Sequence, residues 1–310
     1  MKKIFIPQPV SQEGEGYLEE RGYRIVRGSG RFDKESLKAD IADCDAMLLR
    51  TLKIDREILE AGRKLKIVAR HGAGYDNLDY AAAKELGIRA TCSPDTTGLS
   101  VAEFTIFSIL ACAKKQEECS RELRKYKFGN KGLDVAGKTL GIIGFGRIGS
   151  LVAKKAAYGL DMNILAYVPR REGKVIPDYV RCTDWEKLFR ESDFISVHVP
   201  GGKGNQRLIG ENEFAMMKKT AYMINVSRGG VMDEAAFCEA VTSGRIAGGA
   251  VDVFEAEPPC ADNPLFGLEH VILTPHIGSN TKECMDRIAL DTAEDIDRVL
   301  SGREPRHPIQ

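Results

Sequence analysis

The sequence has no paired cysteine motif, no excess of charge of either sign and no long hydrophobic run. Its eight cysteines lack C-x-x-C spacing, which argues against a disulfide framework or a zinc site and for free thiols in a reducing compartment. Lysine plus arginine equals aspartate plus glutamate at 45 each, so no overall field attracts nucleic acid or an anionic membrane. No stretch approaches a membrane span, and residues 1–7 are too short an apolar run for a signal peptide. We therefore expect a cytoplasmic protein that binds no metal, nucleic acid or membrane.

The chain is long enough for about two domains, each with its own core, because it has 310 residues of which 43% are hydrophobic. Short apolar runs alternate with helical patterns in the first part, which predicts a parallel α/β layer structure. The strand candidates there are residues 4–6, 24–26, 46–49, 66–69 and 88–90. Loops after such strands carry ligands, and the loops 50–53 and 70–77 contain Arg50 and Arg70. The second loop adds glycine N–H groups, which suits a carboxylate or a phosphate, although a surface arginine and an ordinary turn explain it equally well.

Residues 139–149 organise the rest of the chain, because an apolar run there breaks into G-x-G-x-x-G and then into a helical pattern. The pattern predicts a strand, a tight turn and a helix. Gly144 makes the turn, Gly146 lets the backbone approach a pyrophosphate, and Gly149 lets the helix pack on its strand. This predicts a dinucleotide site, while a plain tight turn or a methyltransferase loop shows the same glycines.

Six strands are predicted in the second part of the chain, as in a doubly wound dinucleotide-binding domain. They are residues 140–143, 163–168, 193–198, 221–225, 246–251 and 271–273. Residues 94–98 form a turn cluster and the expected crossing between domains. Ser100 fits a helix N-cap with Glu103 at the capping-box position, which predicts one helix as far as Lys127. That helix either contacts a second subunit or joins the domains. Residues 282–300 are patterned as a helix that returns to the first domain.

The sequence resembles the D-isomer-specific 2-hydroxyacid dehydrogenases, which include phosphoglycerate, glyoxylate and hydroxypyruvate enzymes. The resemblance covers essentially the whole chain and rests on ordered motifs at residues 70–79, 100–103, 139–149, 196–200, 224–230, 249–259 and 274–278. It implies an α/β fold of two doubly wound domains. A Rossmann dinucleotide-binding domain at residues 98–280 is inserted in a flavodoxin-like substrate domain of residues 1–97 plus 281–310. A homodimer is part of this expectation.

The conserved chemistry of that family falls on Arg228, Glu257 and His276. Hydride transfer from an alcohol needs a base for the hydroxyl proton, and histidine, with an ordinary pKa of about 6.5, is suited to this. A carboxylate bonded to the imidazole fixes its orientation and favours its charged form. The planar fork of arginine binds the acid and polarises its C2 oxygen better than lysine does. Singly, each residue also fits a structural role, but the ordered set favours catalysis.

The resemblance also implies which residues contact ligands. The implied cofactor contacts are Gly144, Gly146, Arg147, Ile148, Gly149, Val168, Arg170, Arg171, His198, Pro200 and Asp252. The implied substrate contacts are Arg50, Arg70, Gly72, Ala73 and Gly74.

Two departures from the family pattern are informative. An NAD site expects an acid after the second strand, about 20 residues beyond the glycines, where this chain has Val168 followed by Arg170 and Arg171. The change removes repulsion toward a 2′-phosphate and adds positive charge, so NADP is favoured over NAD, unless these arginines only face solvent. Residues 201–205 read Gly-Gly-Lys-Gly-Asn instead of the usual leucine, threonine and proline-bearing stretch. This implies flexibility near the cofactor.

The substrate remains open. Phosphoglycerate enzymes of the family carry arginines at the positions of Arg50 and Arg70, whereas the NADP preference points to a glyoxylate or hydroxypyruvate reductase. A different class also stays open, because a corepressor branch with the same fold uses dinucleotide binding to govern partner docking.

Overall fold

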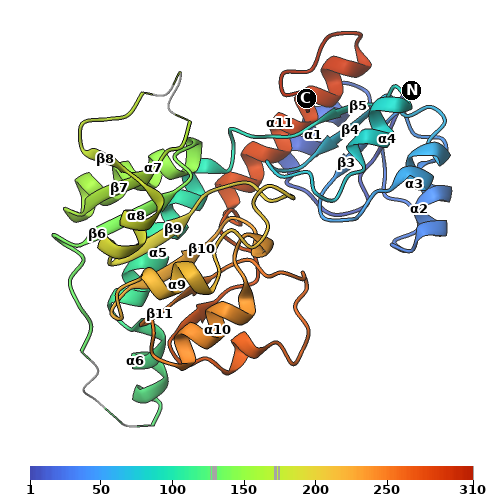
Figure 1. Cartoon of the computed structure of the whole chain (residues 1–310). Helices are drawn as coiled ribbons and strands as arrows, with labels where there is room; N and C mark the ends of the chain where they lie inside the picture. The colour runs from blue at the N-terminus through green and yellow to red at the C-terminus, as the bar shows by residue number, and fades with distance from the viewer. Residues whose placement is uncertain (126, 128–130, 171–172, 174, 310) are drawn as a thin grey trace. The chain divides into compact units, whose positions relative to one another are not determined.

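The computed structural model describes residues 1–125, 127, 131–170, 173 and 175–309. The chain separates into two compact units, residues 1–97 with 280–310, and residues 98–279 (Figure 1). Each unit is a parallel sheet interleaved with helices, which confirms the predicted α/β fold class. Among the described residues, none of the helices has the length and apolar character needed to cross a bilayer.

The first unit has the strand order β2-β1-β3-β4-β5 in its described part, which is the flavodoxin-like order with its switch point between β1 and β3. Its elements are β1 (Lys3–Phe5), α1 (Gln12–Glu20), β2 (Arg24–Val26), α2 (Lys34–Ile41), β3 (Ala46–Leu49), α3 (Arg56–Ala61), β4 (Ile67–Arg70), α4 (Tyr80–Glu85), β5 (Arg89–Thr91) and α11 (Lys282–Leu300). All strands predicted for this part are present.

The first sheet is covered on both faces because successive side chains of a strand alternate. Ile4 packs with Leu18 of α1 and Ile296 of α11, whereas Phe5 packs on the opposite face with Leu37 of α2 and Ile58 of α3. The C-terminal helix α11 contacts α1, β3 and β4 within this unit. The pattern of residues 282–300 therefore predicted both the helix and its packing partner.

The second unit has the order β12-β11-β10-β9-β6-β7-β8 over its described residues. If β6 is counted as the first strand, the order is that of a Rossmann sheet, and β12 is an additional strand at one edge. Its elements are α5 (Gly98–Ala113), α6 (Gln116–Leu123), β6 (Thr139–Ile143), α7 (Arg147–Leu160), β7 (Asn163–Tyr167), β8 (Val180–Thr183), α8 (Trp185–Glu191), β9 (Phe194–Val197), α9 (Glu211–Met216), β10 (Tyr222–Asn225), the 3-10 turn η1 (Gly229–Val231), α10 (Glu234–Thr242), β11 (Gly248–Val251), the 3-10 turn η2 (Pro264–Gly267) and β12 (Val271–Leu273). Strand β8 was not predicted, because only Val180 of its residues is fully buried.

The helices of the second unit divide between the two faces of its sheet (Figure 1). Leu140 and Ile142 of β6 pack with Ile109 of α5 and Val152 of α7. Ile143 lies on the other face, in the cluster that contains α8, α9 and α10. The carboxyl ends of all these parallel strands meet at one edge, where the loops can gather ligand groups.

The prediction of one helix from Ser100 to Lys127 is wrong. Helix α5 begins at Gly98 and ends at Ala113, and α6 follows after a break at Lys115, which has a left-handed backbone with φ +52°. The break is stabilised from outside, since Leu133 N–H donates to the Ala113 carbonyl at 2.8 Å. This bond satisfies the last carbonyl of α5, and the left-handed backbone of Lys115 interrupts the helix.

Candidate active site

The glycine loop joins β6 to α7 with a separate structural reason for each glycine. Gly144 has φ +94°, and a Cβ built on it lies 2.7 Å from the His198 carbonyl oxygen. A Cβ on Gly149 lies 2.3 Å from the Gly144 carbonyl oxygen, so only glycine lets α7 pack this closely. A Cβ on Gly146 meets no described atom within 4 Å. The packing of the chain therefore explains Gly144 and Gly149, while at Gly146 open space lies before the N-terminus of α7.

The end of β7 holds the residues on which the cofactor preference was argued. Val168 follows the strand and is only 4% exposed, within the core of the second unit. Arg170 is exposed. Arg171 lies outside the described residues, so the structure places one of the two arginines.

His198 follows β9 at the switch point of the second sheet, where β9 and β6 are neighbours. Its Nε2 forms a 2.9 Å hydrogen bond with the hydroxyl of Ser196, which is fully buried. Burial lowers the pKa of His198 to about 3, because desolvation disfavours the charged ring. His198 is therefore neutral at physiological pH, and Pro200 follows it at the start of the loop to α9. The Ser196 partner was missed, although a polar residue inside an apolar strand pattern is a usable signal.

Asp252 follows β11 and anchors the loop that carries His276. Its carboxylate accepts from the Thr274 hydroxyl at 2.6 Å and from the Ile277 and Gly278 N–H groups at 2.8 Å each. The His276 N–H donates to the Asp252 carbonyl at 2.8 Å, and His276 has φ +55°. Asp252 is 2% exposed. The side chain predicted to contact cofactor is thus engaged in holding the His276 backbone in an uncommon conformation.

His276 and Glu257 form the predicted pair. The Nδ1 atom of His276 lies 2.8 Å from Oε2 of Glu257, and Oε1 of Glu257 accepts from the Phe254 N–H at 3.2 Å. Burial acts to raise the pKa of Glu257, but the hydrogen bond and charge of His276, the Phe254 N–H and the charge of Arg228 together lower it below its ordinary value. The carboxylate is therefore ionised and fixes which ring nitrogen carries the shared proton.

Arg228 follows β10, and hydrogen bonds hold both its carbonyl and its guanidinium. Asn225, which is fully buried, donates from Nδ2 to the Arg228 carbonyl at 3.1 Å, and Nη1 of Arg228 donates to the Ser227 carbonyl at 2.7 Å. A Cβ on Gly229 lies 1.9 Å from the Phe254 carbonyl carbon, so the turn after Arg228 packs directly on the segment that leads to Glu257. Asn225 was missed by sequence reasoning, although it is the polar end of an apolar strand.

The predicted substrate loops lie in the first unit. Nη1 of Arg50 donates to the Pro9 carbonyl at 2.8 Å, and Nη1 of Arg70 donates to the carbonyl of His71. Gly72 has φ +134° and accepts from the Ser93 N–H at 2.8 Å, while Ala73 and Gly74 are half-buried. Burial, then the charges of Arg50 and Arg70, lower the pKa of His71 to about 4. Arg50 and Arg70 bring positive charge to these loops, which also contain Asp76, and a guanidinium suits an anion.

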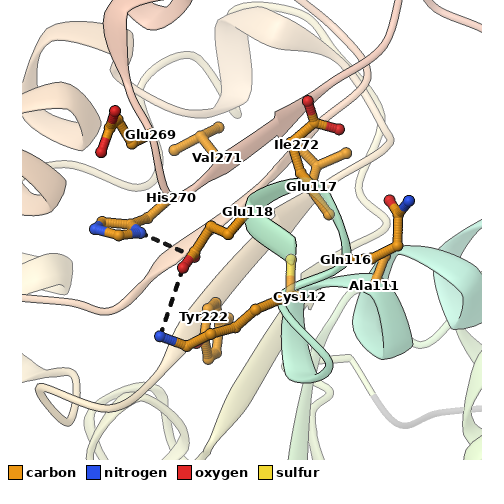
Figure 2. A pocket seen from close by; sticks show the side chains of 11 residues that line it. Ala111, Cys112, Gln116, Glu117, Glu118, Tyr222, Glu269, His270, Val271 and Ile272 are labelled. Atoms are coloured by element: carbon orange, nitrogen blue, oxygen red, sulfur yellow. Dashed lines mark hydrogen bonds and ion pairs between the residues drawn. The ribbon is translucent and has the colours of Figure 1, made fainter. Parts of the chain in front are cut away.

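A pocket without any of the predicted residues lies at the opposite, amino-terminal edge of the second sheet (Figure 2). Tyr222 is the first residue of β10, and His270 directly precedes β12. Glu118 of α6 accepts from His270 Nδ1 at 2.9 Å and lies 3.6 Å from Lys115 Nζ. The contact with His270 attaches α6 to the sheet. No cluster of potential metal ligands occurs among the residues that the structure describes, and each of the eight cysteines is a free thiol there.

Comparison with known proteins gives consistent matches. The family model described as D-isomer specific 2-hydroxyacid dehydrogenase, NAD binding domain, matches residues 106–278. The chain is 37% identical to a D-3-phosphoglycerate dehydrogenase of Archaeoglobus fulgidus over 99% of its own length but 59% of that protein's. It is 38% identical to a hydroxypyruvate reductase of Thermotoga maritima, over 96% of this chain and 98% of that one. A crystal structure of a Thermus thermophilus protein superposes with a TM-score of 0.92 at 30% identity, covering 99% of this chain and 100% of that one.

Proposed function

Because the chain belongs to the D-isomer specific 2-hydroxyacid dehydrogenase family, we propose that it is an oxidoreductase that moves a hydride between a nicotinamide dinucleotide and C2 of a small 2-hydroxy or 2-oxo acid. The observation that carries this proposal is the 2.8 Å contact between His276 and Glu257, beside Arg228 at the carboxyl edge of a Rossmann-ordered sheet. The chain spans about three fifths of the phosphoglycerate dehydrogenase that it matches.

The second unit offers a site that fits the cofactor. Open space at Gly146 leaves the N-terminal N–H groups of α7 accessible to a pyrophosphate. We propose that residues 98–280 are the dinucleotide-binding domain, with contacts from Gly144 to Gly149 and from His198, Pro200 and the Asp252 region. When bound, the nicotinamide supplies or accepts the hydride.

The proton and the carboxylate are handled by the chain's own residues. Nδ1 of His276 is committed to Glu257, so Nε2 is the nitrogen that gives a proton to the C2 oxygen in reduction and takes it back in oxidation. Glu257 stabilises the positively charged ring of His276, which is present before the proton is given in reduction and after it is taken in oxidation. The guanidinium of Arg228 binds the acid through parallel N–H groups and polarises the C2 oxygen.

For the first unit we propose the role of substrate domain, formed by residues 1–97 plus 281–310. The positive loops with Arg50 and Arg70, and the backbone of Gly72, Ala73 and Gly74, suit an anionic acid. For the substrate, we propose glyoxylate or hydroxypyruvate before 3-phosphoglycerate. The cofactor preference proposed below supports this choice, and a hydroxypyruvate reductase of Thermotoga maritima is among the relatives at 38% identity.

We propose that NADP binds more tightly than NAD. Val168 leaves no acid to hold a ribose hydroxyl or to repel a phosphate, and Arg170 is exposed beside it. A charge-assisted contact of about 1.5–3 kcal/mol corresponds to roughly tenfold to hundredfold in affinity. Dissociation constants for NADPH and NADH, measured at one ionic strength because salt screens the contact, test this. Arg170→Ala should weaken NADPH alone, and Val168→Asp should favour NADH. If the unmodified protein binds NADH more tightly than NADPH, Arg170 only faces solvent and does not select the cofactor.

Turnover against a panel of 2-oxo acids, with NADPH and NADH in parallel, tests the activity itself. We expect reduction of glyoxylate or hydroxypyruvate, which His276→Asn abolishes while cofactor binding persists. Cofactor binding without turnover of any acid would favour the alternative, a dinucleotide-sensing binding protein of the same fold.

A further inference from the structure

The glycine-rich segment of residues 201–205 lies against the proposed catalytic arginine. A Cβ built on Gly201 would lie 3.1 Å from Cγ, 3.5 Å from Cβ and 3.8 Å from Cδ of Arg228. Apolar carbons in optimal contact are about 3.5–4.0 Å apart, so the first of these distances is too short. With the backbone of this chain, a Cβ at position 201 would therefore crowd the aliphatic stem of Arg228.

The backbone does not require glycine at this position. Gly202 has φ +107°, which favours glycine, but Gly201 is not among the described residues with positive φ. Gly204 also lacks a positive φ, and a Cβ there meets no described atom within 4 Å. Of these glycines, Gly201 is thus the one whose missing side chain matters to a neighbouring residue.

Neither partner can easily move away from the other. The Arg228 backbone is fixed by Asn225 and by the close packing of Gly229 on Phe254. The segment after Gly201 is fixed as well, because Asn205 Nδ2 donates to the Pro200 carbonyl at 2.9 Å and the Arg207 N–H donates to the Gly230 carbonyl at 2.8 Å. A displaced Cγ would therefore move the guanidinium at the end of the Arg228 side chain.

We propose that Gly201 is a positioning residue, which sets the place of the Arg228 guanidinium by leaving its stem unobstructed. The inference rests on the proposed function, in which Arg228 binds the acid. It gives the unusual sequence of residues 201–205 a role other than flexibility. A small displacement of the Arg228 guanidinium matters because two parallel N–H groups must align with the bound carboxylate.

The experiment compares Gly201→Ala with Gly204→Ala, the same change in the same loop at a position with open space. We expect Gly201→Ala to lower kcat/KM for the 2-oxo acid about tenfold, a barrier change of about 1.4 kcal/mol, through KM and kcat together. The dissociation constant of the reduced cofactor should stay unchanged, which also shows that the variant is folded. Gly204→Ala should match the unmodified enzyme in both measurements.

A second measurement does not depend on activity. The thermal unfolding midpoint is compared for Gly201→Ala in the unmodified and the Arg228→Ala backgrounds. Since Arg228→Ala removes Cγ, the effect of Gly201→Ala should be more favourable there, by about 2–4 °C. Equal effects in both backgrounds overturn the inference, and so does an unchanged kcat/KM in Gly201→Ala. If the unmodified protein reduces no acid, the proposed function fails, while the unfolding midpoints still decide whether Gly201 positions Arg228.

Discussion

At the scale of single residues, the Glu257 carboxylate should control the pH dependence of the reaction. Its lowered pKa means that the ionised form is favoured in the folded protein, so its contribution to stability is present above its ordinary pKa and is lost as pH falls through the lowered value. Glu257→Gln removes the charge that stabilises a protonated His276. Reduction needs that proton, so we expect the alkaline limb of the kcat/KM profile to move to lower pH in this variant.

The pH dependence of the thermal unfolding midpoint gives an independent control for the Glu257→Gln variant. The difference in unfolding midpoint between Glu257→Gln and the unmodified protein should be present at pH 7 and disappear at strongly acidic pH, where Glu257 is protonated in both states. Rate profiles that coincide at every pH would mean that Glu257 only supports its loop.

Arg228→Lys separates charge from geometry at one residue. Lysine keeps the positive charge but cannot offer two parallel N–H groups, so we expect kcat/KM to fall by at least about a hundredfold, the worth of a charge-assisted hydrogen bond of about 3 kcal/mol. Cofactor affinity should not change, and this is the control. Steady-state kinetics with near-normal turnover would contradict the role assigned to Arg228.

At the scale of elements, a glycine-to-alanine change made separately at two positions of the β6–α7 junction distinguishes helix packing from ligand binding. Gly149→Ala places a Cβ 2.3 Å from the Gly144 carbonyl oxygen, so we expect a loss of about 1–3 kcal/mol in stability from overpacking. A Cβ at Gly146 meets no described atom, so Gly146→Ala should cost only the loss of a preferred N-cap residue, lower the unfolding midpoint less than Gly149→Ala does, and weaken cofactor binding. Thermal unfolding and fluorescence titration of both variants check this, and a cofactor affinity unchanged by Gly146→Ala would contradict the proposed pyrophosphate position.

The elements that sequence reasoning predicted are those with a strong local pattern. Ile4 and Phe5 alternate between two buried faces, and such runs are readable without a structure. The end of α5 was not readable, because the carbonyl of Ala113 is taken by Leu133, a residue beyond the helix. The pairing of His276 with Glu257 followed from the resemblance. The anchoring of His276 by Asp252 did not, since hydrogen bonds between distant loops leave no local pattern.

At the scale of the whole molecule, the parallel strand orders of both units gather loops at the carboxyl ends of their sheets. The residues that the sequence assigned to chemistry follow that rule, since Arg228 follows β10, Glu257 follows β11 and His276 follows β12. The residues of the pocket in Figure 2 lie at the other ends of the strands, which leaves them outside the proposed chemistry.

The assembly prediction concerns α5, which is apolar on more than its buried face. Leu99 and Phe107 are 46% and 51% exposed, and Tyr158 of α7 is 70% exposed. These exposed apolar side chains stand on two helices that pack together, and exposed apolar patches mark interaction surfaces, so we propose that a second copy of the chain covers this surface. Light scattering during size-exclusion chromatography should give a mass near twice 34.1 kDa for the unmodified protein. Phe107→Glu should halve that mass, because a buried unpaired carboxylate is costly. Phe32→Glu, at a phenylalanine 50% exposed in the first unit, should leave it unchanged. A single-chain mass for the unmodified protein would exclude the dimer, and a dimeric Phe107→Glu variant would place its interface elsewhere.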